Sequence, residues 1–183
     1  MTPNQVEAKL KLRAIQEQQE PATLLQALGR HFYEVVPLKY ATYCSFTSRI
    51  AKAVLVHFGL PCELQPCQIW YCQPDHTYVI GFLGRPAKGK WDGHVVCRSG
   101  QWLLDTSIHH FAKEFDLPVP YVVSSACFEF PTQALSKWDV NASDRVWWHH
   151  PPQGADVMPP EEPQEIIDGY AAKLIEKLKT ASV

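Results

Sequence analysis

Three residues in the middle of this 183-residue chain have side chains suited to nucleophilic catalysis. Cys44 begins an apolar segment, His94 begins a short β-branched segment, and Asp105 lies near the end of the segment after it. A thiolate can attack a carbonyl carbon, an imidazole can accept and return the proton, and a carboxylate can orient the imidazole and stabilise its charged form. Whether the three work together depends on the elements that position them.

The segment CSFTSRIAKAVLVHFGLP, residues 44–61, predicts an amphipathic helix. Apolar side chains recur at every fourth residue: Phe46, Ile50, Val54 and Phe58. Gly59 suits the left-handed position after a helix, and Pro61 prevents continuation. Cys44 therefore lies in or just before the first turn, where free N–H groups and the helix dipole favour a thiolate and an oxyanion. The alternative is a buried cysteine that acts as a small apolar side chain.

The segment GHVVCRSGQWLLDTS, residues 93–107, predicts a β-hairpin with Ser99-Gly100 as a two-residue turn. This register places His94 directly opposite Asp105, with both side chains on one face of the hairpin. An imidazole and a carboxylate so placed can form a hydrogen bond. A three-residue loop would instead place Leu104 opposite His94. The other interpretation is a surface ion pair at the open end of the hairpin, worth about 0–1 kcal/mol.

The rest of the chain predicts one α+β domain over residues 1–183, with a core at about 22–130. Helices are expected at 4–18 and 22–35, before the helix that carries Cys44. Antiparallel strands are expected at 63–72, 77–83, 93–98, 101–107 and 120–130. A Pro-rich segment at 131–160 is expected to be irregular. A final amphipathic helix at 162–179 is expected to pack back on the domain, and a dimer contact is the alternative.

Composition and charge argue against several classes of protein. The net charge is −2 without a long basic run, so nothing indicates nucleic-acid binding. The longest apolar stretches are shorter than a membrane span, and the N-terminal residues lack the apolar core of a signal peptide. We therefore expect a cytoplasmic protein whose six cysteines are free thiols.

Other cysteines and histidines have the residue types of metal ligands but not a suitable spacing. The candidates are Cys62, Cys67 and Cys72 and the pairs His109–His110 and His149–His150. A spacing of five is unusual for zinc, and neighbouring histidines on a strand point in opposite directions. We expect no structural zinc and regard the histidine pairs as solvated loop residues. In VWWHHPP, residues 146–152, one Trp is expected in the core and the place of the other stays open.

The segments CSFTSRIAKAVLVHFGL, GHVV and QWLLDTS together resemble the transglutaminase-like and papain-like cysteine enzyme superfamily. In that superfamily a Cys opens the central helix, a His follows on a strand, and an Asp comes on the next strand. The resemblance covers about residues 40–108 and implies a papain/transglutaminase-like core. It assigns Cys44 as the nucleophile, His94 as the general base and acid, and Asp105 as the residue that orients His94.

The chemistry that this resemblance implies is acyl transfer through a thioester. We expect a cysteine-dependent hydrolase, a peptidase or amidase, that acts on a peptide, amide or acyl substrate without a metal or organic cofactor. Acyl transfer of the transglutaminase or N-acetyltransferase type and a catalytically inactive binding module are the alternatives. The sequence departs from the family at Val96 and Thr106, where an aromatic residue and a proline are common. It has no evident side-chain donor for the oxyanion, and Tyr40 or Tyr43 is the candidate.

Overall fold

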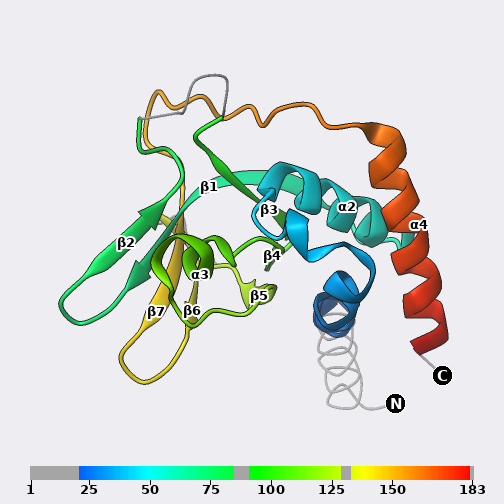
Figure 1. Ribbon diagram of the computed structural model, residues 1–183, viewed down its shortest axis with the longest axis horizontal. Helices are drawn as coiled ribbons and strands as arrows, with labels where there is room; N and C mark the ends of the chain where they lie inside the picture. Colours follow the sequence, from blue (N-terminus) through cyan, green and yellow to red (C-terminus); the bar gives the residue numbers. More distant parts are fainter. Residues whose placement is uncertain (1–20, 85–90, 129–132, 182–183) are drawn as a thin grey trace, which may run out of the picture.

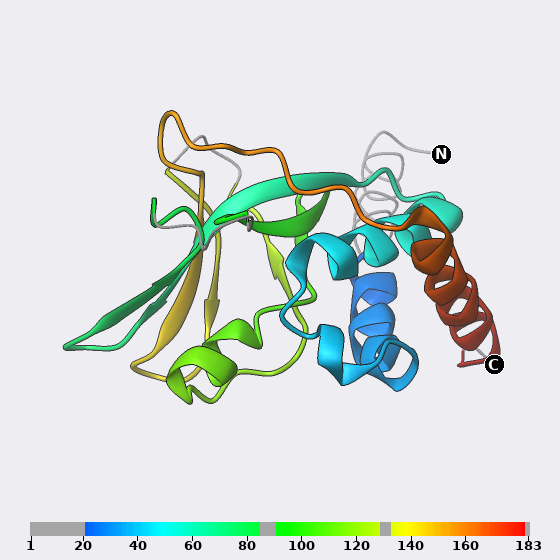
Figure 2. The same cartoon turned by 45° about the horizontal axis from the view of Figure 1, so that its top comes forward.

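The computed structural model describes residues 21–84, 91–128 and 133–181. In these ranges, helix 21–35, α2 (Cys44–His57) and α4 (Gln164–Ala181) lie on one side of a curved antiparallel sheet, as Figures 1 and 2 show. The short helix α3 (His110–Phe115) packs on the other side, and a 3-10 turn, η1 (Leu38–Tyr40), precedes α2. The prediction of an α+β fold is confirmed. The helix expected at 4–18 lies outside the described residues.

The described strands form one sheet in the order β5-β4-β3-β1-β7-β6, with β2 also paired to β1. Their bounds are β1 Glu63–Cys72, β2 Thr77–Ile80, β3 His94–Ser99, β4 Trp102–Asp105, β5 Val123–Ala126, β6 Ala134–Asp139 and β7 Arg145–His149. Although β5 and β6 lie at opposite ends of this order, Cys127 and Ser136 form a bridge that connects them. The Ser125 hydroxyl also donates to the carbonyl of Lys137 at 2.6 Å. The sheet therefore curls into a nearly closed barrel.

Strand β1 joins the two halves of this barrel. Its residues 63–67 pair with β3, and its residues 68–72 pair with β7 on one side and largely with β2 on the other. The strand predicted at 63–72 is thus confirmed over its whole length. Because β1 is continuous, the strands that carry His94 and Trp148 are fixed relative to one another.

The prediction of an irregular segment at 131–160 is wrong for residues 134–149. These residues form the hairpin of β6 and β7. Alternate apolar side chains, including Val146 and Trp148, are fully buried in the barrel. Asn141 closes the turn, because its side-chain oxygen accepts the N–H groups of Ser143 at 2.9 Å and Asp144 at 2.8 Å. The prolines that suggested irregular structure lie mainly after the hairpin, at residues 151–163.

The predicted register of the β3–β4 hairpin is also wrong. Ser99 pairs with Trp102, so the turn is Gly100-Gln101 rather than Ser99-Gly100. Gly100 has φ +57°, which suits the first central position of a type II′ turn. The pairing therefore moves by two residues, and His94 is not directly opposite Asp105. A shift of two preserves which face each side chain occupies, because strand side chains alternate with a period of two.

Two clusters of buried side chains lie on opposite faces of β3 and β4. Cys97 and Leu104 face the helices and join the cluster formed by helix 21–35, α2 and α4. Val96 and Leu103 face the interior of the barrel. The helix expected at 162–179 is α4, and it packs on α2 as predicted. Within the described ranges, no helix is both long and apolar enough to cross a membrane.

Candidate active site

Cys44 is the first residue of α2, where the sequence analysis placed it. Tyr43 precedes the helix with φ −99° and ψ 71°, and its side chain makes no capping hydrogen bond. The N–H groups of the first turn are therefore not capped by this residue and point toward the start of the helix. The Cys44 thiol donates to the carbonyl of Gly93, with 3.8 Å between sulfur and oxygen. The nucleophile candidate thus lies beside the residue that precedes His94.

His94 and Asp105 form a direct hydrogen bond despite the shifted register. His94 Nε2 donates to Asp105 Oδ2 at 2.9 Å, and both side chains have 0 % exposure. They lie on the barrel-facing side, because each is two residues from Val96 or Leu103 on its own strand. Their relationship across the hairpin is diagonal, and a long imidazole side chain can bridge such a separation. The interpretation as a solvated surface ion pair is wrong, since neither group reaches solvent.

Two further groups hold the Asp105 carboxylate. Trp148 Nε1 donates to Oδ2 at 2.8 Å, and the backbone N–H of Ser107 donates to Oδ1 at 2.9 Å. Trp148 is fully buried on β7, so the barrel brings a distant strand to the pair. Trp148 is the core Trp of VWWHHPP. Its contact with Asp105 was not predicted, although alternation of Val146 and Trp148 signals a strand with this Trp facing inward.

The charges of the pair stabilise one another. Burial lowers the pKa of His94, but the charge and hydrogen bond of Asp105 and the nearby Cys44 thiol outweigh burial and raise the pKa to about 10. Burial raises the pKa of Asp105, but the charge and hydrogen bond of His94 and the donors Trp148 and Ser107 bring the net pKa below its ordinary value. His94 therefore holds its proton near pH 7 beside an ionised carboxylate.

The second nitrogen of His94 is not bonded to Asp105. His94 Nδ1 is buried and has no hydrogen-bond partner of ordinary geometry among the described residues. The Cys44 thiol is close enough to the imidazole to contribute to its raised pKa. Cys44 retains 8 % exposure, whereas His94 and Asp105 are fully buried.

Hydrogen bonds between α2 and β3 fix the position of the thiol relative to His94. Ser48 Oγ donates to the carbonyl of Val95 at 2.9 Å, and Cys97 Sγ donates to the carbonyl of Ser48 at 3.0 Å. Both hydrogen bonds are buried, and Ser48, which forms them, lies one helical turn after Cys44. The helix therefore cannot slide along the strand without breaking buried hydrogen bonds.

His110 lies next to this site, although the sequence predicted a solvated loop residue at this position. It lies in α3, its Nε2 donates to the carbonyl of Thr42, and its ring centroid is 5.9 Å from that of His94. Burial and the charge of His94 lower the pKa of His110 to about 4. His110 is therefore neutral near pH 7 and tethers the loop that leads to Cys44. The expectation of a solvated loop residue is wrong for His110.

The two tyrosines proposed as oxyanion donors lie in different environments. Tyr40 packs its ring against Phe46 and Tyr170, with centroid distances of 4.6 and 6.1 Å. Tyr43 is 56 % exposed and contacts Tyr40 edge to face. The hydrogen bond of the Cys44 thiol goes to the carbonyl of Gly93 and not to either tyrosine hydroxyl. The N–H groups at the start of α2 are the donors closest to Cys44 along the chain.

The remaining cysteines and histidines do not gather into a metal site. The described part of the chain has no cluster of three or more His, Cys, Asp or Glu residues that could hold a metal ion. All six cysteines are free thiols. His149 belongs to β7 and packs on Trp70 with 4.5 Å between ring centroids, so it is not the loop residue that was expected.

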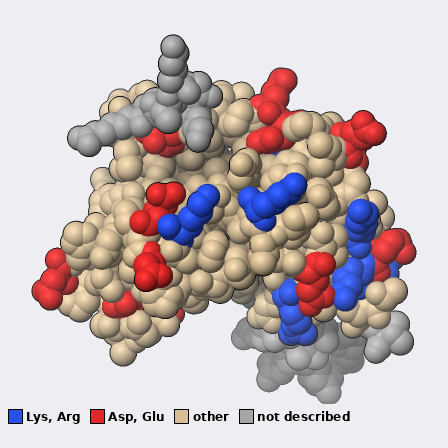
Figure 3. Space-filling model, in the orientation of Figure 1, with Lys and Arg blue, Asp and Glu red and all other residues tan. Residues whose placement is uncertain are grey.

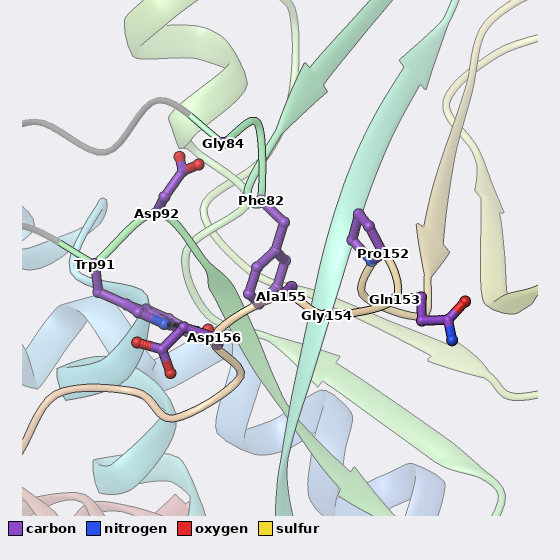
Figure 4. Close-up of a pocket in the computed structure, with 9 residues that line it drawn as sticks. All are labelled: Phe82, Gly84, Trp91, Asp92, Pro152, Gln153, Gly154, Ala155 and Asp156. Atoms are coloured by element: carbon purple, nitrogen blue, oxygen red, sulfur yellow. Dashed lines mark hydrogen bonds between the residues drawn. The ribbon is translucent and has the colours of Figure 1, made fainter.

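A cavity opens beside the residues that precede His94. Phe82, Gly84, Trp91 and Asp92 line one side, and residues 152–156 line the other (Figure 4). Trp91 contacts both Gly93 and the second side, where its indole N–H donates to the carbonyl of Asp156 at 2.8 Å.

Comparisons with known proteins found no matching family model, no matching curated protein and no matching solved structure. The site is therefore interpreted from its residues and their geometry.

Proposed function

We propose that the protein is a cysteine-dependent hydrolase, a peptidase or amidase, with a core of the papain/transglutaminase type. The observation that carries the proposal is the position of His94: Asp105 holds Nε2, buried Nδ1 is not engaged by another group among the described residues, and the Cys44 thiol is near enough to the imidazole to raise its pKa. A nucleophile, a base and a residue that orients the base are the elements of a catalytic triad. A pair kept for stability alone has no need of a thiol near its imidazole.

In the proposed reaction, His94 is the imidazolium and Cys44 reacts as the thiolate, because the raised pKa of His94 favours the proton on the imidazole. The sulfur of Cys44 attacks the substrate carbonyl. Asp105 stabilises the imidazolium, and the N–H groups at the start of α2 stabilise the oxyanion. His94 then gives the proton to the leaving group as the thioester forms. Water attacks the thioester with His94 again as the base, which releases the acyl product. These steps use no metal and no organic cofactor.

The proposed substrate is a peptide, an amide or another acyl compound rather than a nucleic acid. The net charge is −2, and acidic and basic side chains are mixed over the face shown in Figure 3. Nucleic-acid binding generally needs a clustered basic surface. Free thiols at all six cysteines support the cytoplasm as the proposed location.

Alkylation kinetics test the nucleophile. Iodoacetamide labelling, followed by peptide mass spectrometry from pH 5 to 9, should modify Cys44 at least about tenfold faster than partly buried Cys127 near pH 7. His94→Gln should remove this advantage and leave the labelling of Cys127 unchanged. Circular dichroism of each variant checks that it is folded. Labelling of Cys44 no faster than Cys127 in the wild type would overturn the proposal.

Trapping of the acyl-enzyme tests the reaction. An activated ester such as p-nitrophenyl acetate should acylate the wild type with a burst and leave Cys44→Ala unmodified. Intact-mass measurement should then show loss of the acyl group to water. Faster loss to an added primary amine than to water would replace hydrolysis by acyl transfer as the function.

A further inference from the structure

Two cysteines outside the candidate active site are neighbours at the start of β1. Leu64 of β1 pairs directly with Cys97 of β3, and Cys62 lies two residues before Leu64. Cys62 and Cys97 both pack in the cluster of buried side chains under the helices, so they lie on the same face of the sheet. Because Cys62 precedes the first ladder pair of β1, which joins Glu63 to Arg98, Cys62 moves toward Cys97 without breaking the sheet.

The two thiols differ in their access to solvent. Cys62 is half-buried and lines a surface cavity beside Pro61, Glu63 and Arg98. Cys97 is only 1 % exposed. A small reagent in solution therefore meets the sulfur of Cys62 first, and the sulfur of Cys97 lies behind it.

Cys62 is also the thiol that ionises more readily. The thiols are near enough that a hydrogen bond with Cys97, together with the charge of Lys52 on α2, lowers the pKa of Cys62 although partial burial opposes this. Burial and the neighbouring Cys62 raise the pKa of Cys97. An accessible thiolate beside a second thiol is the arrangement found in cysteines that respond to oxidants.

Cys97 also links β3 to the helix that carries Cys44. Its thiol donates to the carbonyl of Ser48 at 3.0 Å, one turn after Cys44. A thiol has a single proton, so this hydrogen bond is lost when the sulfur of Cys97 forms a bond to another sulfur. The hydrogen bond from Ser48 Oγ to the carbonyl of Val95 does not depend on Cys97. Oxidation of Cys97 would therefore loosen α2 on β3 without releasing it.

We infer that Cys62 and Cys97 form a peroxide-sensitive thiol pair whose disulfide weakens the docking of α2. The Cys62 thiolate attacks hydrogen peroxide: an S–O bond forms, the O–O bond breaks, and the departing hydroxide takes up the proton that Cys62 released. The Cys97 sulfur then attacks the sulfenic acid: an S–S bond forms, the S–O bond breaks, and water leaves with the proton of Cys97. The two thiols thus lose two electrons to one peroxide. The expected effect on Cys44 rests on the proposed function, whereas the disulfide does not.

Peroxide treatment of the full chain tests the pair. Non-reducing peptide mass spectrometry should show a disulfide between Cys62 and Cys97, which dithiothreitol removes. Cys62→Ser should abolish it, and Cys72→Ser, at a half-buried cysteine on the same strand, should leave it unchanged. In Cys97→Ala the reaction should stop at the sulfenic acid of Cys62, which dimedone traps. No disulfide between Cys62 and Cys97 in wild type that remains folded by circular dichroism would overturn the inference, as would its formation at the same rate in Cys62→Ser and wild type.

Hydrogen exchange measures the docking of α2 without relying on the chemistry of Cys44. Amides of α2 should exchange about three- to tenfold faster in the oxidised protein, the effect of losing one buried hydrogen bond, and those of β7 should not. Cys62→Ser treated with the same peroxide should show no change. Unchanged exchange of α2 in protein that contains the disulfide would contradict the effect on docking.

The labelling rate of Cys44 connects the pair to the proposed function. Iodoacetamide labelling of Cys44 should slow by a similar factor in the oxidised protein and recover with dithiothreitol, and it should be unchanged in reduced Cys62→Ser. Slow labelling of Cys44 already in the reduced wild type would contradict the catalytic proposal alone, because the disulfide and the exchange of α2 are measured separately.

Discussion

Trp148 donates its indole N–H to Asp105 Oδ2 at 2.8 Å, and this is the same oxygen that His94 contacts at 2.9 Å. The carboxylate is therefore oriented by β7 as well as by the hairpin that carries the pair. Because β7 reaches Asp105 only through the curvature of the sheet, the acid–base pair depends on the nearly closed barrel.

Replacement of Trp148 by Phe should weaken the pair while keeping an aromatic ring in the core. The lost hydrogen bond to a buried carboxylate should lower the free energy of unfolding by about 1–3 kcal/mol, in addition to the smaller ring volume. Urea denaturation measures this change, and iodoacetamide labelling of Cys44 should also slow. Trp138→Phe is the control, because Trp138 is partly buried in the same cluster without this contact. Equal destabilisation by both variants would contradict the role of Trp148.

The pair should give stability a distinct dependence on pH. The pKa of His94 is raised from 6.5 to about 10, so its contribution is complete below pH 6.5 and is lost as the pH rises toward 10. The pKa of Asp105 is lowered from 3.8, so its contribution is complete above that value and is lost as the pH falls through the lowered pKa. Asp105→Asn should therefore cost about 3–5 kcal/mol at pH 5–6 and less near pH 10. Urea denaturation of both proteins at each pH measures the difference, and a constant difference up to pH 10 would refute this account.

The contribution of His110 to stability should depend on pH in the direction opposite to that of His94. Its pKa is lowered from 6.5 to about 4, so its contribution is complete above pH 6.5 and is lost as the pH falls to about 4. His110→Gln keeps a donor for the carbonyl of Thr42 but cannot titrate, so it should lose less stability than the wild type between pH 6.5 and 4. The difference should be on the order of 3 kcal/mol. His76→Gln at an exposed site is the control. The same loss of stability in wild type and His110→Gln would show that burial of His110 is unimportant.

The turn at Gly100 should determine the stability of the hairpin. Gly100→Ala should destabilise the protein by about 1–3 kcal/mol, because φ is +57° at this position. The added Cβ would meet no neighbouring atom, so the backbone conformation alone accounts for this cost. Gly169→Ala in α4 also adds a Cβ without a contact, but there it should stabilise the helix by about 0.5–1 kcal/mol. Thermal unfolding of the two variants should thus shift in opposite directions. Shifts of the same sign would mean that the turn is not constrained as described.

Local patterns in the sequence were sufficient to predict the elements that carry Cys44 and His94. The apolar stripe of α2 and the length of β1 depend on residues close together in the sequence and on burial of one face. The periodic spacing of apolar residues shows that buried face directly. The turn of the β3–β4 hairpin could not be located, because a single Gly suits either central position in different turn types. The face shared by His94 and Asp105 was nevertheless correct, since an error of two residues leaves it unchanged.

Contacts between distant segments account for what the sequence could not predict. Trp148 is 43 residues from Asp105, and His110 is 68 residues from Thr42. Each contact exists because the barrel or α3 places a side chain next to another element. The prolines after residue 150 also concealed the β6–β7 hairpin, whose alternating side chains are otherwise typical of a strand pair.

The two clusters of buried side chains place the parts of the candidate site in different layers of the fold. His94, Asp105 and Trp148 are bonded within the barrel, whereas the backbone that holds Cys44 belongs to the layer of helices. Partial opening of the helical layer would move the sulfur while leaving the proton acceptor assembled. The reactivity of Cys44 therefore depends on the docking of α2 on β3, which the hydrogen bonds of Ser48 maintain.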